Sequence, residues 1–140
     1  MTSTSDGPAP PGGLIVLNRD ECFGLLGTTG VGRIAFVGPS GPVIHPVNYL
    51  VDEGTIVLRT SPYTMLGEHS VGQVAFEVDE LDEWMSRGWS VLITGRSAPI
   101  DDPDEAIAIR RRGLLHPWAE GQRNLFVRIT PVEISGRRIS

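Results

Sequence analysis

The sequence lacks lysine altogether and contains a single cysteine. All 12 basic residues are arginine, so no lysine is available for a Schiff base or for acid–base catalysis. Cys22 cannot form a disulfide within the chain, which fits a reducing compartment. No stretch approaches the roughly 20 apolar residues that cross a bilayer. These absences predict a cytoplasmic protein that does not bind membranes.

Long basic tracts and metal-binding motifs are also missing. The formal net charge is −5, and the densest basic cluster, Arg110–Arg112, lies on a predicted helix with acidic residues upstream. Nucleic-acid binding is therefore not expected. His45, His69 and His116 are far apart in the sequence, and no CxxC, HxH or HExxH pattern occurs. We predict no metal site.

The composition is that of one soluble domain. The chain has 140 residues, of which 40% are apolar and 21% are charged, as in ordinary globular proteins. Residues 1–13 are rich in Ser, Pro and Gly and lack the basic and apolar regions of a signal peptide, so we expect a disordered tail. Residues 14–140 are expected to form a single folded domain.

Alternating apolar residues separated by turn sequences predict six strands. These are Gly32–Val37, Val43–Val51, Thr55–Thr60, Gln73–Val78, Trp89–Ile100 and Leu125–Ile134. Asn18 and Glu21 predict a capped helix that ends near Leu26, and Asp102, Pro103 and Glu105 predict a second helix to about Arg112. A helical turn is expected over residues 64–69, and an irregular crossover over 114–123.

This pattern predicts a mostly β fold, a small antiparallel β-barrel with two or three short helices. Apolar residues occur on both faces of Val43–Leu50. A strand covered by its own core on one face and by a second subunit on the other has this composition. The sequence therefore predicts a homodimer.

Arg59, Thr60 and Ser61 follow an apolar strand and suit a phosphate group. A guanidinium offers a planar set of donors to phosphate oxygens and keeps its charge, while the two hydroxyl groups add neutral donors. Taken alone, Arg-Thr-Ser is common, and an ordinary exposed strand end is the alternative interpretation. The surrounding strand pattern favours the phosphate site.

Other chemically suggestive residues have structural explanations. Cys22 is expected to be a core residue of the first helix rather than a nucleophile. Glu77 and Asp79 share one face of a strand, but the acidic run that they begin is expected to be a solvated connection. Trp89 is expected in a core or an interface. Trp84 and Met85 are expected to be exposed, where they could cover a pocket or a partner.

A series of short motifs follows in a defined order over residues 16–140. The motifs are Gly30–Ala35, His45–Tyr49, Arg59–Ser61, Val74–Asp79, Gly88–Val91, Gly95-Arg96, Ile129–Pro131 and Ser135–Arg138. Each motif is loose by itself, but their order resembles that of the pyridoxamine 5'-phosphate oxidase-like flavoproteins. The resemblance implies an FMN-binding split barrel that forms a homodimer with FMN in each of two clefts.

The resemblance also assigns roles to individual residues. It places the strand that contains Pro46–Asn48 beside the isoalloxazine ring and the segment Arg59–Ser61 around the phosphate. It also places Ser90 at the polar edge of the ring and Trp118 of the partner subunit over the ring. The residues expected to bind the cofactor are Pro46, Val47, Asn48, Arg59, Thr60, Ser61, Ser90 and Trp118. His45, next to the ring strand, is a candidate on the substrate side.

One departure from the family concerns the charge at the phosphate. Relatives commonly carry a lysine where this chain has Met65, and the loss of one charge-assisted bond costs about 1.5–3 kcal/mol. The leading hypothesis is an FMN-dependent oxidoreductase that acts on an unidentified small molecule. An F420-dependent reductase of the same fold and a non-catalytic flavin-binding or dimeric interaction module are the alternatives.

Overall fold

The computed structural model describes residues 13–60, 71–113 and 125–139, which form seven strands and two helices. The elements are β1 (Leu14–Leu17), α1 (Arg19–Leu26), β2 (Val31–Gly38), β3 (Gly41–Asp52), β4 (Thr55–Thr60), β5 (Gly72–Asp82), β6 (Arg87–Pro99), α3 (Pro103–Arg111) and β7 (Leu125–Ile139). The mostly β fold predicted from the sequence is confirmed. Neither described helix is long and apolar enough to span a membrane.

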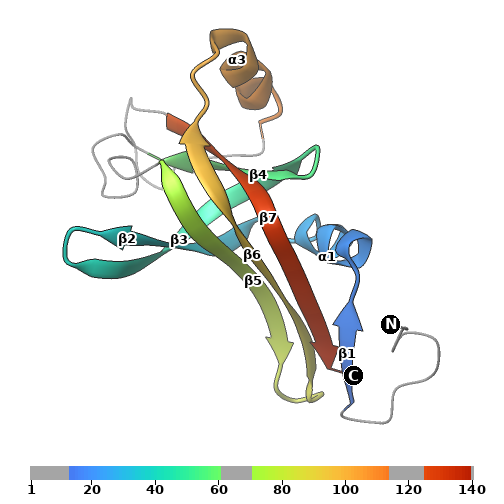
Figure 1. Cartoon of the computed structure of the whole chain (residues 1–140). Coiled ribbons are helices and arrows are strands. Elements are labelled where there is room, and N and C mark those ends of the chain that lie inside the picture. The colour runs from blue at the N-terminus through green and yellow to red at the C-terminus, as the bar shows by residue number, and fades with distance from the viewer. Residues whose placement is uncertain (1–12, 61–70, 114–124, 140) are drawn as a thin grey trace.

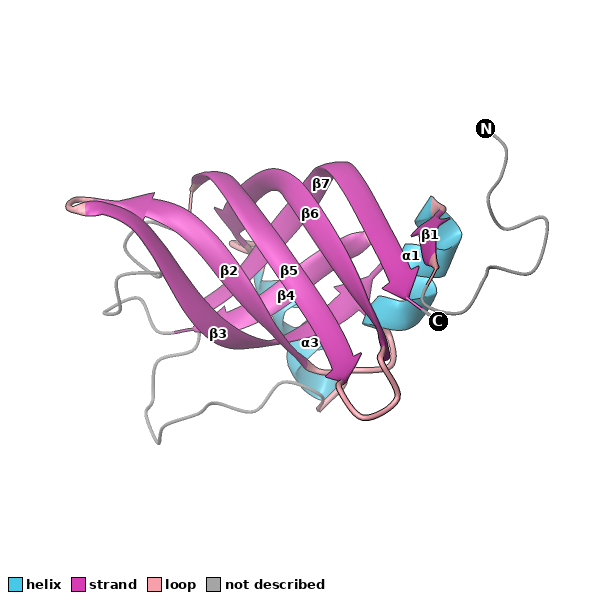
Figure 2. Cartoon of the chain, turned by 90° about the horizontal axis from the view of Figure 1, so that it is seen from below, coloured by secondary structure: helices cyan, strands magenta, loops and turns pink. Residues whose placement is uncertain are grey.

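Six of the strands close into a ring (Figures 1 and 2). The sheet order is β1-β7-β4-β3-β2-β5-β6, and β6 pairs again with β7. All of these pairings are antiparallel. The seventh strand, β1, lies outside the ring and extends the sheet along the end of β7. Closure leaves the ring strands without free edges over their paired lengths.

β4 has the predicted bounds, the other five predicted strands are longer than the sequence pattern predicted, and β1 was not predicted. β5 continues through Glu80 to Asp82, where a turn was expected, and it pairs with β6 as far as Asp82–Arg87. β7 continues beyond Ile134 to Ile139. These extensions have exposed residues on both faces, so hydrogen bonds between strands, rather than alternating burial, hold them. Apolar periodicity therefore gives no signal for them.

The inner face of the ring forms the main core. Its fully buried members include Ile34, Phe76, Ile93 and Ile129. Helix α1 packs beside the barrel, next to β7, and buries Cys22 and Leu26 in the same core (Figure 1). The predicted structural role of Cys22 is thus confirmed, and burial raises the pKa of its thiol above the usual value.

The predicted cap of α1 is present. The Asn18 side chain accepts a hydrogen bond from the Glu21 amide at 2.8 Å, and the Glu21 carboxylate accepts one from the Asn18 amide at 2.9 Å. The other end of α1 is tied to the barrel by Tyr49. Its hydroxyl donates to the Leu26 carbonyl at 2.6 Å and lies 2.5 Å from the Thr29 hydroxyl. The helix is therefore fixed at both ends.

Gly95 allows β6 and β7 to approach closely. The register between these strands shifts at Thr94 and Gly95. A Cβ on Gly95 would collide with the Thr130 carbonyl oxygen and come within 3.0 Å of the Pro131 Cα. Because these atoms belong to the backbone, rotation of a side chain cannot relieve the contact. The shift requires glycine at this position.

Helix α3 packs on the outer face of β3, β4 and β7. Its Ile109 joins Leu50, Val57 and Phe126 in a second apolar cluster. Arg128 of β7 then braces the helix, since it donates to Asp52 at 2.9 Å and to Glu105 at 2.5 Å. This ion pair holds the first turn of α3 against the barrel.

The cap of α3 differs in one respect from the prediction. Asp102 is the N-cap and accepts a hydrogen bond from the Asp104 amide at 3.2 Å, with Pro103 in the first turn as expected. Glu105 was expected to complete the cap, but its carboxylate lies against Arg128. A guanidinium from a distant strand thus replaces the local backbone donor.

Candidate functional site

Strand alternation separates the residues predicted along β3. Val47 is buried in the main core at 5% exposure. Pro46 and Asn48 therefore project from the opposite, outer face of the barrel. This outer face carries the side chains of the predicted ring strand. A ligand on that face can contact Val47 only through its backbone.

His45 shares the inner side of β3 with Val47. Its ring stacks on Phe36, with the ring centroids 5.7 Å apart and the planes at 28°. Phe36 itself belongs to the main core. The imidazole is half-buried and points away from the surface that carries Pro46 and Asn48. The structure therefore does not bring His45 together with the other predicted residues of β3.

Arg59 and Asn48 lie together on the outer face. Tyr49 pairs with Leu58, and Asn48 and Arg59 are the next residues beyond this pair, with the same orientation. The Arg59 guanidinium lies over the ring of Phe126, 5.6 Å from its centroid. Thr60 follows at the end of β4, and alternation places its side chain on the opposite face, with Leu58. The structure thus brings together Asn48 and Arg59 from the predicted set.

A second arginine acts on this position. Arg110 of α3 follows Ile109, which packs in the same cluster as Phe126. Burial and then the positive charge of Arg110 lower the pKa of the Arg59 guanidinium below its ordinary value. The Arg110 side chain itself is exposed on α3.

Three charged side chains cluster on the outer face of β2 and β5. Arg33 donates to Glu77 at 3.2 Å and to Asp79 at 3.4 Å. Burial and the neighbouring Asp79 raise the pKa of Glu77 to about 7, although Arg33 opposes the shift. Glu77 and Asp79 share one face of a strand, as expected, but they are half-buried and ion-paired rather than solvated. Arg33 also pairs across the sheet with Pro46.

Ser90 lies on a different side of the barrel. It pairs with Asp79 on β5 and with Arg137 on β7. Its strand, β6, is three strands from β3 in either direction around the six-stranded ring. At about 4.8 Å per strand, the outer faces of the two strands are on opposite sides of the barrel. One chain alone does not bring Ser90 to the surface of Pro46 and Asn48.

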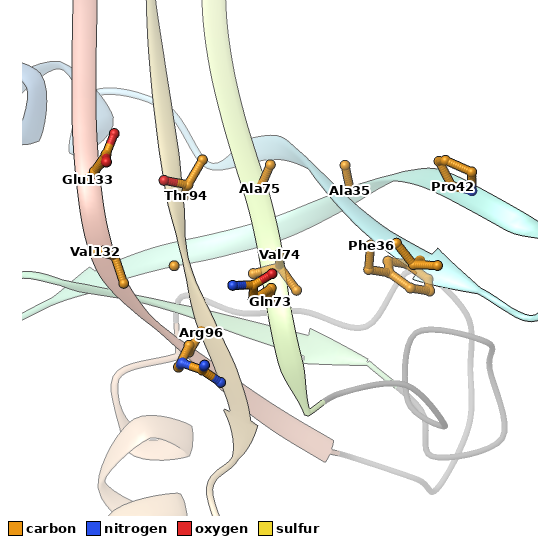
Figure 3. Close-up of a pocket in the computed structure, with 12 residues that line it drawn as sticks. Ala35, Phe36, Pro42, Gln73, Val74, Ala75, Thr94, Arg96, Val132 and Glu133 are labelled. Carbon is orange, nitrogen blue, oxygen red and sulfur yellow. The ribbon is translucent and has the colours of Figure 1, made fainter.

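A groove of about 500 Å³ crosses β2, β5, β6 and β7 (Figure 3). Ala35, Ala75, Thr94 and Glu133 lie in one row across these strands. Two alanines and Gly95 leave room above the sheet, while Glu133 and Arg96 supply charge at its borders. On β2 and β5, the Ala35–Ala75 pair of the groove is two residue pairs from the Arg33–Glu77 pair.

The remaining predicted residues fall elsewhere. Ser61, Met65 and Trp118 lie outside the described residues. Trp89 is packed against the main core, as expected. Trp84, in the turn between β5 and β6, is 97% exposed. In the described ranges no three His, Cys, Asp or Glu side chains are grouped as metal ligands.

Comparison with known proteins identifies the family. The family model for pyridoxamine 5'-phosphate oxidase matches residues 18–138. The chain belongs to this family. An uncharacterized protein of Mycobacterium tuberculosis is 35% identical over 132 residues, which cover 90% of this chain and 86% of that protein. The predicted family and the split-barrel fold are thereby confirmed.

Solved structures of family members have the same fold. A Corynebacterium glutamicum protein of the pyridoxamine 5'-phosphate oxidase type is 29% identical, with a TM-score of 0.76 over 95% of this chain and 97% of that one. An FAD-binding protein from Mycobacterium smegmatis is 31% identical, with a TM-score of 0.74 over 89% and 96%. Both proteins therefore resemble this chain over nearly their whole length.

The sequence interpretation missed two arginines of the outer face. Alternation along Gly32–Val37 places Arg33 on the same face as Ala35, and alternation through residues 73–79 places Glu77 with Asp79. The sequence pattern therefore did contain a signal for an ion pair between Arg33 and these carboxylates. Arg110 had no comparable signal, because it was considered only as part of a basic cluster. Its approach to Arg59 depends on the packing of α3 against Phe126, which is a tertiary contact.

Proposed function

We propose that this protein binds a phosphorylated flavin, FMN, at the outer face of β3 and β4 and performs redox chemistry on a small molecule. The observation that carries the proposal is the placement of Arg59 beside Asn48 on the outer face, at the end of β4, in a chain of this family. A bound flavin would supply the hydride chemistry, and the protein would supply binding and electrostatics. This division fits a site without a catalytic triad or a metal cluster among the described side chains.

The residues present fit a flavin phosphate. Arg59 offers a guanidinium fork on the outer face, and the aromatic ring of Phe126 lies under the guanidinium. Charge-assisted hydrogen bonds from arginine are the usual means of phosphate recognition. Next to them, Pro46 and Asn48 present an apolar and a polar side chain along β3, as a flat ring with a polar edge requires.

The position of Ser90 supports a homodimer. If Ser90 contacts the ring edge as the family resemblance implies, it must come from a second copy, since its own β3 is on the other side of the barrel. The outer face also exposes large apolar side chains, Val31, Ile44 and Leu92, at 49%, 66% and 45%. Apolar residues at these positions suit an interface between subunits. We propose that each flavin lies between two copies.

FAD is a second candidate for the cofactor. The Mycobacterium smegmatis relative, 31% identical over most of both chains, is an FAD-binding protein. FMN and FAD share the isoalloxazine ring and a phosphate at the same carbon, so both fit the proposed contacts of Arg59. The deazaflavin F420 and a flavin-binding role without catalysis remain the alternatives from the sequence.

The test measures flavin binding to the purified protein and to Arg59→Ala. We expect yellow protein that binds FMN or FAD, and a dissociation constant about tenfold to a hundredfold weaker in the variant. Riboflavin, which has no phosphate, should bind both proteins equally. The exposed Arg87, replaced by Ala, is the control. Equal losses for FMN and riboflavin would contradict the phosphate role of Arg59.

The dimer has its own test. Ile44→Asp places a charge on the exposed outer face of β3, which we expect to produce a monomer by sedimentation and to abolish flavin binding in the same step. Val132→Asp is the control, because Val132 is exposed at 72% on β7 and is not part of the proposed interface. A wild-type monomer that binds FMN tightly would refute the two-subunit site.

A further inference from the structure

The groove on the outer face of β2, β5, β6 and β7 takes no part in the proposed flavin site. Pro46, Asn48 and Arg59, which are proposed to hold the flavin, are not among the described residues that line it. Its volume of about 500 Å³ falls within the range of small-molecule sites in proteins, roughly 300–1,000 Å³. The groove is therefore large enough for a ligand of its own.

Small residues at neighbouring positions of three strands form the floor of the groove. Ala35 of β2 pairs with Ala75 of β5, and Gly95 lies beside them on β6. Alanine and glycine are disfavoured in strands, because they offer little side chain to pack. The pairing of β2 with β5 ends at the two alanines, and the strands then diverge (Figure 3). The core residues Phe36 and Val74 line the space that opens between them.

A β-bulge in β7 builds one wall of the groove. Thr94 pairs with Glu133, and the next pair is Gly95 with Pro131. Val132, between the two, therefore has no partner on β6. Val132 and Glu133 are consecutive, yet both are exposed, which breaks the alternation of the strand. Bulges re-aim side chains and are frequent next to active sites. Here the bulge places the Val132 side chain at the edge of the groove.

The polar side chains of the groove favour an anion at one end. Arg96 pairs in register with Gln73, so a guanidinium and an amide are neighbours on the outer face. Arg96 forms no ion pair with an acidic side chain in the described ranges. Glu133, the other charged side chain of the groove, lies on the far side of Val132 (Figure 3). The donors at Arg96 match a carboxylate, which a guanidinium binds through two parallel hydrogen bonds.

We propose that this groove is a binding site for a small, flat, apolar molecule that carries one carboxylate. The apolar body lies on the floor of Ala35 and Ala75, between the Val132 wall and the β2–β3 hairpin. The carboxylate meets Arg96 and Gln73. This site goes beyond the proposed flavin function and does not depend on it, since none of the residues proposed to hold the flavin lines the groove.

The test titrates the purified protein with cinnamate and with cinnamyl alcohol, which has the same apolar body but no charge. We expect cinnamate to bind more tightly than the alcohol by calorimetry. Arg96→Gln should weaken cinnamate about fivefold, because the guanidinium is partly in water, and should leave the alcohol unchanged. Arg87→Gln is the matched control, since Arg87 is an exposed arginine of the same strand. It should change the affinity for either probe by less than about twofold.

A second substitution tests the floor of the groove. Ala75→Leu adds a larger side chain that points into the groove, and it should weaken cinnamate and cinnamyl alcohol alike, by about tenfold. Ala108→Leu is the control, because it adds the same bulk at an exposed position of α3 and should leave both affinities unchanged. Thermal melts without a probe check that each variant is folded.

Three results would overturn the inference. The first is a wild type that binds neither probe at millimolar concentration, and the second is an equal loss of both probes in Arg96→Gln. The third is displacement of cinnamate by FMN, which would place both ligands in one site. If cinnamate does not bind and Ala75→Leu lowers the mass in sedimentation, the groove holds a second copy instead. A protein that binds cinnamate but no flavin would contradict the proposed function alone.

Discussion

Replacing Glu77 by glutamine should stabilise the protein at neutral and alkaline pH, and the effect should disappear in acid. Glu77 shares Arg33 with Asp79 at 3.2 and 3.4 Å. Burial and the second carboxylate raise its pKa from the ordinary 4.5 to about 7. A glutamine keeps an acceptor for Arg33 but removes the charge that repels Asp79. The folded state of the variant therefore avoids the cost of ionising Glu77.

The direction of the pH dependence follows from proton binding. Because the pKa is raised in the folded state, the folded wild type binds more protons than the unfolded chain between about pH 4.5 and pH 7, and its stability falls as the pH rises through this range. Above about pH 7 Glu77 is ionised in both states and the penalty is complete. Below about pH 4.5 it is protonated in both, and the penalty vanishes.

The magnitude follows from the shift and from the exposure of the side chain. A shift from 4.5 to about 7 corresponds to an upper limit of about 3 kcal/mol. The Glu77 side chain is 34% exposed, so water screens much of the interaction. We therefore expect Glu77→Gln to raise the free energy of unfolding by about 1 kcal/mol at pH 8, and by almost nothing near pH 4.

Urea unfolding, followed by tryptophan fluorescence at fixed protein concentration, measures this difference at several pH values. Glu80→Gln is the control, since Glu80 is exposed on the same strand. A variant that is less stable than the wild type at pH 8, or a difference that is constant from pH 4 to pH 8, would refute the reasoning.

Two further predictions concern the packing of the barrel. Gly95→Ala should lower the free energy of unfolding by about 3 kcal/mol, because its Cβ meets backbone atoms of β7. The control is Gly30→Ala, which has no atom within 4 Å of the added Cβ and should change the free energy of unfolding by less than about 0.5 kcal/mol. Equal effects of the two substitutions in thermal melts would contradict the argument. Tyr49→Phe should lower the free energy of unfolding by about 1–2 kcal/mol, because it removes the hydrogen bond to the buried end of α1. Hydrogen exchange of the backbone amides should then show faster opening of that helix. Unchanged exchange in α1 would count against the role of the hydroxyl group.

Local signals in the sequence predicted the helix caps and most of the strands. Asn18 and Glu21 form the predicted capping box, because a cap depends only on residues three positions apart. β1 has four residues and is defined by its pairing with the distant end of β7, so no local pattern marks it. Glu105 is likewise three positions after the N-cap and was predicted to complete the cap, but in the structure its carboxylate pairs with Arg128 of β7. This partner is distant in the sequence, so no local pattern indicates it.

The candidate site was predictable only in part, for a similar reason. The strand end at Arg59 could be predicted, since a strand end is a local feature. Strand alternation could also have separated Val47, which is in the core, from its neighbours. The effect of Arg110 on the pKa of Arg59 depends on how α3 packs, and the distance of Ser90 from β3 depends on closure of the ring. Both are properties of the tertiary structure.

Closure of the barrel has a consequence for the order of folding. β7 is the last of the described strands in the sequence, yet it pairs with β1, β4 and β6. Until it is in place, β4 and β6 each present an open edge that another chain could extend. Contacts between distant parts of a chain also form slowly. The nascent protein should therefore pass through a stage with two unprotected edges, and the rate at which β7 docks should decide how much of it aggregates.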